Sequence, residues 1–252
     1  MLLYLIVCPL VFLAGFVDSI AGGGGLISLP AFFFAGLPAH VAIGTNKLSS
    51  TLGTSVSTVR YFKQGFVPVK MAVCSSVAAL CGSLIGANLS LLISESVIRH
   101  MMIVVLPVVA FYVLKNKDFG ESRQMGTMKK EVQLLISMGA GFVIGIYDGL
   151  YGPGTGTFLL LLLTGIAHMG LKEANGITKA INLTTNLTAL AVYLMNGKVI
   201  FLLGLIAGIF SIAGNYLGTR CFDKGGAKFV KPLMMVVLVI FFIKTLSEIL
   251  GA

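Results

Sequence analysis

The sequence predicts an all-α polytopic membrane protein built from two homologous repeats. Hydrophobic residues make up 57% of its 252 positions and charged residues only 11%, and its mean hydropathy is +0.99. This leaves too little polar surface for a water-soluble globule. Apolar runs such as residues 157–166 lack the period-two alternation of a membrane barrel, so the spans are expected to be helices. Motif residues also recur at a constant spacing in the two halves.

The repeat is seen in glycine, aspartate and lysine residues, which do not match by chance as easily as apolar residues do. Asp18, ahead of one glycine cluster, recurs as Asp148 ahead of another, at a shift of 130 positions. Most other matches share a shift of 132 positions: Gly22, Gly24, Gly44, Lys47, Tyr61, Gly65, Val67, Gly82 and Gly86 recur as Gly154, Gly156, Gly176, Lys179, Tyr193, Gly197, Val199, Gly214 and Gly218. We expect a first membrane repeat over 1–114, a cytoplasmic linker over 115–131 and a second repeat over 132–252.

Each repeat is predicted to hold five helical segments. Those of the first repeat are 2–20, 26–36, 39–64, 69–93 and 96–114, and those of the second are 132–151, 155–168, 172–196, 199–222 and 229–250. Crossing the hydrocarbon takes about 20 helical residues, so the second segment of each repeat is too short to cross comfortably. We expect it to join the first segment as one helix pair broken at glycine, forming two strained crossings or a hairpin that dips to mid-membrane.

The ends of these segments carry further signals. The stretch before Asp18 lacks the basic region of a signal peptide and is expected to stay in the fold. Glycines spaced four residues apart let membrane helices approach closely, and we expect this role for three pairs: Gly82 and Gly86, Gly141 and Gly145, and Gly214 and Gly218.

Basic residues favour an odd number of crossings per repeat. With an odd number, most lysines and arginines share one side: Arg60, Lys63, Lys70, Lys115, Lys117, Arg123, Lys129, Lys130, Arg220, Lys224, Lys228 and Lys231. The other side keeps only Arg99, Lys198 and Lys244. The positive-inside rule makes the basic side cytoplasmic and leaves both termini on the opposite face. The two repeats are then inverted, as in many secondary transporters.

Two acidic residues lie in apolar sequence, where a charge is costly unless it is paired, neutral or facing water. Asp18 and Asp148 are therefore candidates for proton coupling. The alternative is that each caps the following broken turn by accepting backbone N–H bonds.

The glycine clusters that follow are the first candidate substrate site. Glycine allows backbone conformations closed to other residues and leaves N–H groups uncovered at the next helix start, which attracts anions. The alternative is a tight packing turn between helices. The residues concerned are Gly22, Gly23, Gly24 and Gly25 in the first repeat, and Gly152, Gly154, Thr155 and Gly156 in the second.

The third segment of each repeat supplies the other candidates. In the first repeat a stripe along one helix face is formed by residues at steps of three and four, namely Lys47, Thr51, Thr54, Thr58 and Tyr61. Further hydroxyl and amide side chains crowd the upper half of this stripe. Such a stripe can simply bond neighbouring helices, and Lys47 could reach the membrane surface, but its counterpart Lys179 suggests a pair of cations facing a shared anion. The candidates are Thr45, Asn46, Lys47 and Ser50, with Lys179, Asn182 and Asn186.

Other functions have less support. The four cysteines show no metal-ligand spacing and are expected to act as small hydrophobic residues. Three scattered histidines give no catalytic grouping, so we predict no enzyme, no metal and no cofactor. Topology accounts for the net charge of +9, and no basic run suggests nucleic acid.

The motifs resemble those of a known family. The strings DSIAGGGGLISLP and AIGTNK in the first half, with DGLYGPGTGTFL and ITKAIN in the second, are similar to the paired signatures of the sulfite exporter TauE/SafE family. That family is also called the toluene sulfonate uptake permeases, and the similarity is greatest to its YfcA-like branch. The resemblance covers essentially the whole chain and implies a duplicated multi-pass protein of the inner membrane that transports small anions such as sulfite, sulfonates or organic acids. Pro153 and Thr155 replace glycines of the first break, so the site is not expected to be symmetric.

We therefore expect a secondary transporter in the plasma membrane that moves a small anion by alternating access, with proton coupling through Asp18 or Asp148. The partners are the anionic substrate and the lipid bilayer. An anion channel using the same residues is the main alternative, and an intramembrane enzyme is a remote one. The sequence leaves open which anion is moved, the direction, the coupling ion and the oligomeric state.

Overall fold

The protein is described from a computed structural model, which covers the whole chain except residues 1, 99, 102–103, 106–127 and 224–252. Described residues form helices and no strands. The helices are α1 Leu2–Ala21, α2 Gly25–Phe34, α3 Ala39–Lys63, α4 Val69–Leu92, α6 Lys130–Leu150, α7 Thr155–Gly165, α8 Leu171–Met195 and α9 Phe201–Asp223. An all-helical fold is therefore confirmed, with bounds close to those expected. The linker and most of both fifth segments lie outside the described residues.

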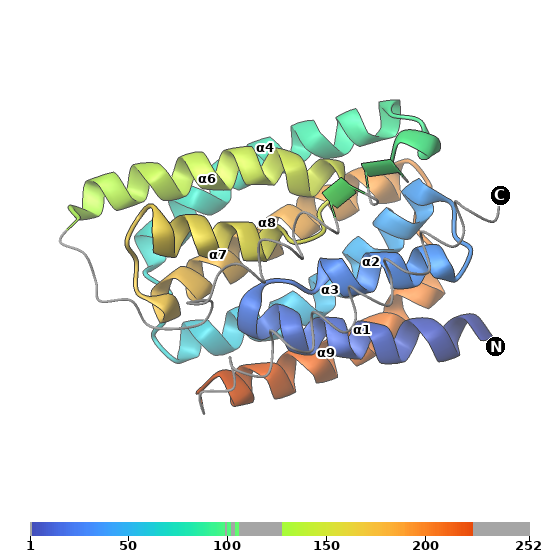
Figure 1. Cartoon of the computed structure of the whole chain (residues 1–252), viewed down its shortest axis with the longest axis horizontal. Coiled ribbons are helices and arrows are strands. Elements are labelled where there is room, and N and C mark those ends of the chain that lie inside the picture. Colours follow the sequence, from blue (N-terminus) through green and yellow to red (C-terminus); the bar gives the residue numbers. More distant parts are fainter. Residues whose placement is uncertain (1, 99, 102–103, 106–127, 224–252) are drawn as a thin grey trace.

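The helices form a bundle whose long axis is horizontal in Figure 1. Helix α4 packs along α6 at one edge, and α1 packs along α9 at the other. Helices α3 and α8 lie between these pairs and contact each other. The short α2 and α7 turn back beside α1 and α6, respectively. Helices α1 and α6 run in opposite directions along the long axis (Figure 1).

Four of the described helices are long and apolar enough to cross a membrane. These are the outer helices, over Leu3–Ala21, Val69–Leu92, Lys130–Leu150 and Phe201–Phe222. The 25-residue α3 and α8 are long enough but carry the polar stripes, and their polar side chains are mostly buried within the bundle. The finding agrees with a multi-pass membrane protein.

Glycine allows the outer pairs to pack backbone against backbone. A Cβ atom on Gly82 or Gly86 of α4 would overlap the main-chain oxygens of Phe142 or Ile146 in α6. On α6, Gly141 and Gly145 meet α4 in the same way, and on α9, Gly214 and Gly218 meet α1. The expected close-packing role of these glycines is confirmed.

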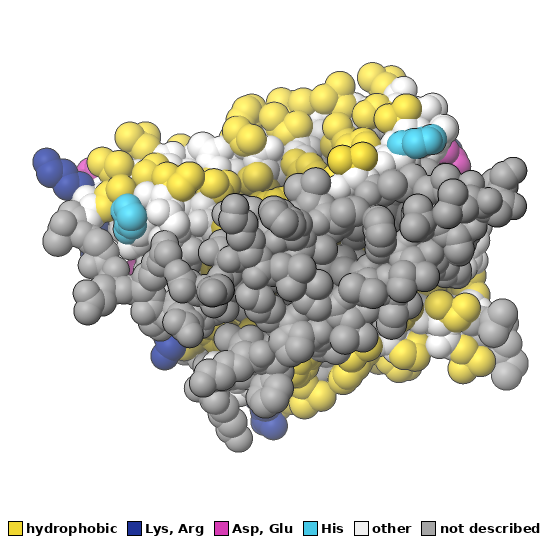
Figure 2. Space-filling view, in the orientation of Figure 1, with side chains coloured by type: hydrophobic (Ala, Val, Ile, Leu, Met, Phe, Trp, Pro, Cys, Tyr) yellow, Lys and Arg dark blue, Asp and Glu magenta, His cyan; other side chains and the backbone are white. Residues whose placement is uncertain are grey.

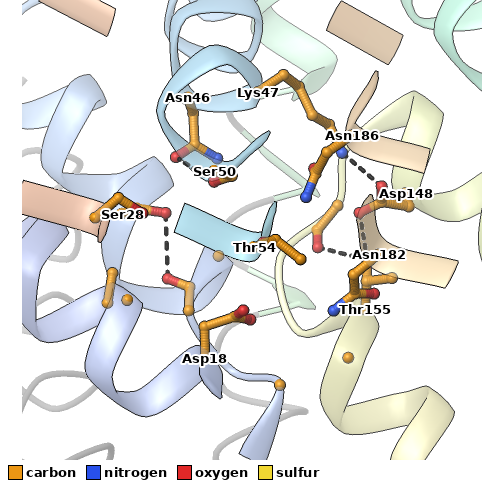
Figure 3. A pocket seen from close by; sticks show the side chains of 18 of the residues that line it. Asp18, Ser28, Asn46, Lys47, Ser50, Thr54, Asp148, Thr155, Asn182 and Asn186 are labelled. Carbon is orange, nitrogen blue, oxygen red and sulfur yellow. Dashed lines mark hydrogen bonds and ion pairs between the residues drawn. The ribbon is translucent and has the colours of Figure 1, made fainter. Parts of the chain in front are cut away.

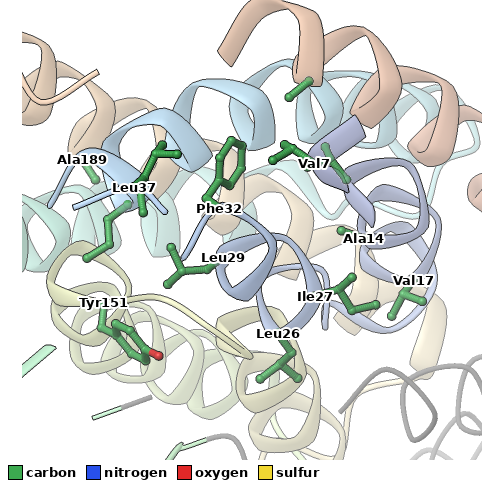
Figure 4. Close-up of a cluster of buried hydrophobic side chains, with 14 of the residues drawn as sticks. Val7, Ala14, Val17, Leu26, Ile27, Leu29, Phe32, Leu37, Tyr151 and Ala189 are labelled. Carbon is green, nitrogen blue, oxygen red and sulfur yellow. The ribbon is translucent and has the colours of Figure 1, made fainter. Parts of the chain in front are cut away.

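The short helix α2 is buried by its surroundings. In α2, residues Leu26 to Phe32 are all buried, as expected for a helix that is apolar on every face. Figure 4 shows Leu29 and Phe32 inside a cluster with Val7 of α1 and Tyr151 after α6. This packing fixes the first glycine break beside the second.

Basic side chains gather at one end of the bundle. Lys63 ends α3, Lys70 and Lys130 lie at the starts of α4 and α6, and Arg220 lies near the end of α9. These helix ends lie at the left of Figure 1, and the Lys and Arg side chains visible in Figure 2 lie on the same side. The described part of the chain therefore places on one end several of the residues for which a cytoplasmic location is predicted.

Candidate functional site

The two glycine breaks meet in the middle of the bundle. Gly22 has a φ of 72°, Gly152 of 97° and Gly154 of 82°, values that favour glycine. Gly22 and Gly156 also touch: a Cβ atom on either would overlap the other's backbone. The breaks thus serve both alternatives raised by the sequence, since they pack tightly and also expose backbone to a shared space.

That space is a small polar cavity of about 40 Å³, with room for roughly three water molecules. Figure 3 shows polar side chains converging on it from both halves of the chain. Its lining consists of Val11, Ala14, Gly15, Asp18, Gly22, Gly24, Gly25, Ser28, Asn46, Lys47, Ser50, Thr54, Asp148, Tyr151, Gly152, Thr155, Gly156, Asn182, Asn186, Ser211 and Asn215.

Each of the two aspartates pairs with a lysine from the other half of the chain. Lys47 Nζ donates to Asp148 Oδ2 at 2.6 Å, and Lys179 Nζ donates to Asp18 Oδ2 at 2.8 Å. The two lysine side chains are 3% and 0% exposed. Burial of an unpaired charge in a membrane protein is costly, so each ion pair makes the burial of its partners possible.

These pairs bear on the alternatives raised for the same residues. At 3% exposure Lys47 does not reach the membrane surface. The N-cap residues of α2 and α7 are Gly24 and Gly154, which have no side chain to cap the helix start. Asp148 instead accepts hydrogen bonds from Lys47 and, at 2.7 Å, from the hydroxyl of Thr155. In the structure both carboxylates accept hydrogen bonds from side-chain donors, and a capping role for Asp18 and Asp148 stays a prediction.

Several polar atoms around the cavity have no partner among the described residues. Asn182 Oδ1, Asn215 Oδ1 and the Tyr151 hydroxyl are buried without a hydrogen bond. The Nδ2 atom of Asn215 donates to Ser211 O at 3.0 Å, which orients its Oδ1 away from that carbonyl. Buried polar groups are normally paired, so unpaired atoms around a cavity indicate that a polar ligand or water belongs there.

Most of the predicted site residues line this cavity. Those that do are Gly22, Gly24, Gly25, Asn46, Lys47, Ser50, Gly152, Thr155, Gly156, Asn182 and Asn186, with Asp18 and Asp148. Gly23, Thr45, Gly154 and Lys179 are not in the lining. The Thr45 hydroxyl accepts a hydrogen bond from the Ile200 amide at 3.0 Å, and Lys179 is directed at Asp18. The structure thus brings one of the two lysines to the cavity and sets the other behind an aspartate.

Sequence reasoning missed the contribution of α9. Ser211 and Asn215 are four residues apart, which places them on one face of a largely apolar helix. Gly15 of α1 and Gly53 of α3 leave space for them, since a Cβ atom at either would overlap Ser211 or Asn215. Two polar residues at this spacing were an available signal. Ser28 and Thr54 also line the cavity.

Comparison with known proteins agrees with this architecture. The model of the family described as "Sulfite exporter TauE/SafE" matches residues 7–245. The probable membrane transporter protein ORF9 of Sinorhizobium sp is 34% identical over 237 residues, covering 94% of this chain and 90% of the relative. The probable membrane transporter protein YfcA of Escherichia coli is 30% identical over 236 residues, covering 94% and 87%. A probable membrane transporter protein of Haemophilus influenzae is 28% identical over 225 residues, covering 89% and 87%.

No solved structure matches the chain. The family match spans nearly the whole length of the chain. The relatives are named as probable membrane transporters, and the similarity covers most of their length. The chain therefore belongs to the sulfite exporter TauE/SafE family of membrane transporters.

Proposed function

We propose that this protein is a secondary transporter of a small anion and that the substrate binds in the cavity between the two glycine breaks. One observation carries the proposal: a small polar cavity lies where two broken helices meet, and charged, hydroxyl and amide groups line it. Discontinuous helices that meet at a buried site are typical of secondary transporters.

The halves are proposed to be inverted repeats. Three observations support this: α1 and α6 run in opposite directions (Figure 1), α1 packs on α9 as α6 packs on α4, and each aspartate pairs with the lysine of the other half. Rocking of one repeat against the other would then open the cavity to alternate sides of the membrane.

The cavity favours a compact substrate. Its volume of about 40 Å³ suits an oxyanion of a few heavy atoms, and larger sulfonates require it to widen. The description of the family names sulfite, and sulfite, short sulfonates and small organic acids are the proposed substrates of this chain.

Individual residues have distinct proposed roles. Lys47 attracts the anion's charge, with backbone N–H groups at the starts of α2 and α7 adding a weaker attraction. Ser50, Asn182 and Asn186 orient the anion through hydrogen bonds. Lys179 acts indirectly, by holding Asp18 and the end of α1 in place.

An anion channel with the same lining is the main rival. Counterflow distinguishes a carrier from a channel. Proteoliposomes that contain a carrier and are loaded with unlabelled sulfite accumulate external labelled sulfite transiently, whereas proteoliposomes that contain a channel do not. We expect counterflow, and we expect sulfite or methanesulfonate to raise the thermal unfolding midpoint of the purified protein, because a ligand that binds only the folded state stabilises it. Sulfite flux without counterflow would favour the channel.

A further inference from the structure

The two ion pairs have the same composition but different surroundings. Lys179 Nζ donates to both the carboxylate and the backbone carbonyl of Asp18. Its side chain is fully buried and does not line the cavity. Lys47 and Asp148, in contrast, both line the cavity. A substrate in the cavity therefore has access to Lys47 and no access to Lys179.

The end of α1 is held by further bonds from other helices. Tyr61 of α3 donates to Ser19 O at 2.6 Å, Asn175 of α8 to Ile20 O at 3.1 Å, and Thr157 of α7 to Ala21 O at 3.1 Å. At the shift of 132 positions, Asn175 and Thr157 correspond to Ile43 and Gly25, which have no side-chain donor. The two breaks therefore differ in the residues themselves. This difference is the same whichever side of the membrane the cavity faces.

Thr155 is placed to bond Asp148 with and without a proton. Its hydroxyl oxygen lies 2.7 Å from Asp148 Oδ1 and 2.6 Å from Gly152 O, and a hydroxyl has one hydrogen to donate but can also accept. With Asp148 ionised, Thr155 donates to the carboxylate. With Asp148 protonated, the acid donates to Thr155, and Thr155 turns its hydrogen to Gly152 O. The residues that correspond to Thr155 in the first break, at shifts of 132 and 130, are Gly23 and Gly25, so Asp18 has no such partner.

Lys47 is the charged partner of Asp148 among the described residues. Nearby Tyr147 of α6, Tyr151 directly after α6 and Tyr193 of α8 are phenols, which stay neutral at physiological pH. Helix α7 has no titratable side chain, and the charged residue of α4, Lys70, lies in its first turn. On α1, Asp18 is engaged by Lys179.

Among the residues that the structure describes, the charges around the cavity therefore sum to zero: two aspartates and two lysines. A buried anion added to this neutral set leaves one negative charge uncompensated, which is costly. Protonation of Asp148 releases Lys47 as a single free cation, and one monoanion neutralises it. A dianion would still leave one charge unbalanced.

We propose, resting on the proposed function, that each transport cycle carries one monoanion together with one proton: the proton binds the Asp148 carboxylate, and the anion takes its place on Lys47. The movement is electroneutral, and both ions leave together when Lys47 and Asp148 pair again. Lys179 and Asp18 remain paired throughout. The form of sulfite that is carried is then hydrogen sulfite.

Proteoliposomes test this with two labelled probes, methanesulfonate, which is a monoanion at every accessible pH, and sulfite, which changes from monoanion to dianion as the pH rises. An inward proton gradient of one pH unit should drive about tenfold accumulation of methanesulfonate, since one proton moving across one unit is worth about 1.4 kcal/mol. A membrane potential set with potassium and valinomycin should have no effect. The ratio of sulfite to methanesulfonate uptake should fall with rising pH as hydrogen sulfite is depleted.

The Asp148→Asn variant sharpens the test, because its site keeps a free Lys47 charge at every pH. It should still exchange methanesulfonate, lose the tenfold proton-driven accumulation, and become sensitive to membrane potential. Thr155→Val should weaken the coupling of anion transport to the proton, whereas Thr155→Ser should preserve it. These two variants replace Asp148→Asn in the test if gel filtration shows that Asp148→Asn does not fold. Accumulation driven by the membrane potential in the wild type, or proton-driven accumulation retained by Asp148→Asn, overturns this inference but leaves the proposed function intact. Absence of flux for both probes contradicts the proposed function as well.

Discussion

The inner helices α3 and α8 and the outer helices α1, α4, α6 and α9 divide two tasks between them. Outer helices meet the hydropathy expected of membrane spans, and residues such as Leu84 and Phe210 are exposed on the bundle surface. The inner helices are less hydropathic than a typical membrane span because they carry buried lysines, threonines and asparagines. Hydropathy therefore identifies the scaffold, and the two inner helices that it misses bring six polar side chains to the cavity: Asn46, Lys47, Ser50, Thr54, Asn182 and Asn186.

The largest stability effect is expected where an inner charge loses its partner. Asp18→Ala leaves Lys179 buried without its carboxylate, and removing one member of a buried ion pair typically costs about 3 to 5 kcal/mol. Thermal or denaturant unfolding in detergent measures this loss. The double variant Asp18→Ala with Lys179→Met should recover much of it. Equal stability of the single variant and the wild type would contradict a buried, charged Lys179.

The outer pairs should be sensitive at their glycines. A Cβ atom on Gly86 would overlap the carbonyl of Ile146, so Gly86→Ala must separate α4 from α6, at a cost of about 1 to 3 kcal/mol. Gly139 of α6 is the matched control, because a Cβ atom there meets nothing within 4 Å. Gly139→Ala should stabilise the helix by up to about 1 kcal/mol. If both variants shift the unfolding midpoint alike, the close contact is absent.

A smaller effect is expected for the inner tyrosine that holds α1. Tyr61→Phe removes the hydrogen bond to Ser19 O and should cost about 0.5 to 1.5 kcal/mol. Tyr216 of α9, whose side chain is 38% exposed, provides a comparison in which the same change should have little effect. A Tyr61→Phe protein as stable as the wild type would mean that this bond adds no net stability.

The smallest effect is expected on the bundle surface. Leu84 of α4 is 46% exposed, and Leu84→Val should change the free energy of unfolding by no more than about 0.5 kcal/mol. A clearly larger loss, measured under the same conditions, would show that protein covers this face.

Much of the architecture could be predicted from the sequence because local signals determine it. Glycine clusters after Asp18 and Asp148 located both breaks. The steps of three and four along α3 placed Lys47 and Thr54 on one face, and both line the cavity. Close contacts at spaced glycines followed from their spacing alone.

The pairing of charges could not be predicted in this way. Lys47 and Asp148 are 101 residues apart, and no local pattern fixes how one half sits against the other. Without that register, lysines and aspartates were assigned separate roles, and Lys179 was expected at the substrate although it lies behind Asp18. Ser211 and Asn215 were missed because the surrounding apolar sequence of α9 suggested only a membrane span.

Anion binding at Lys47 is the central claim, and titration calorimetry with sulfite on two charge-balanced variants tests it most directly. Lys47→Met with Asp148→Asn and Lys179→Met with Asp18→Asn each remove one ion pair and leave the site neutral, and Lys63→Met removes an exposed lysine from α3. We expect the first variant to bind sulfite about tenfold to a hundredfold more weakly, because a charge-assisted contact is worth about 1.5 to 3 kcal/mol. The second variant and Lys63→Met should bind like the wild type. Unchanged affinity without Lys47, or an equal loss without Lys179, would contradict this account.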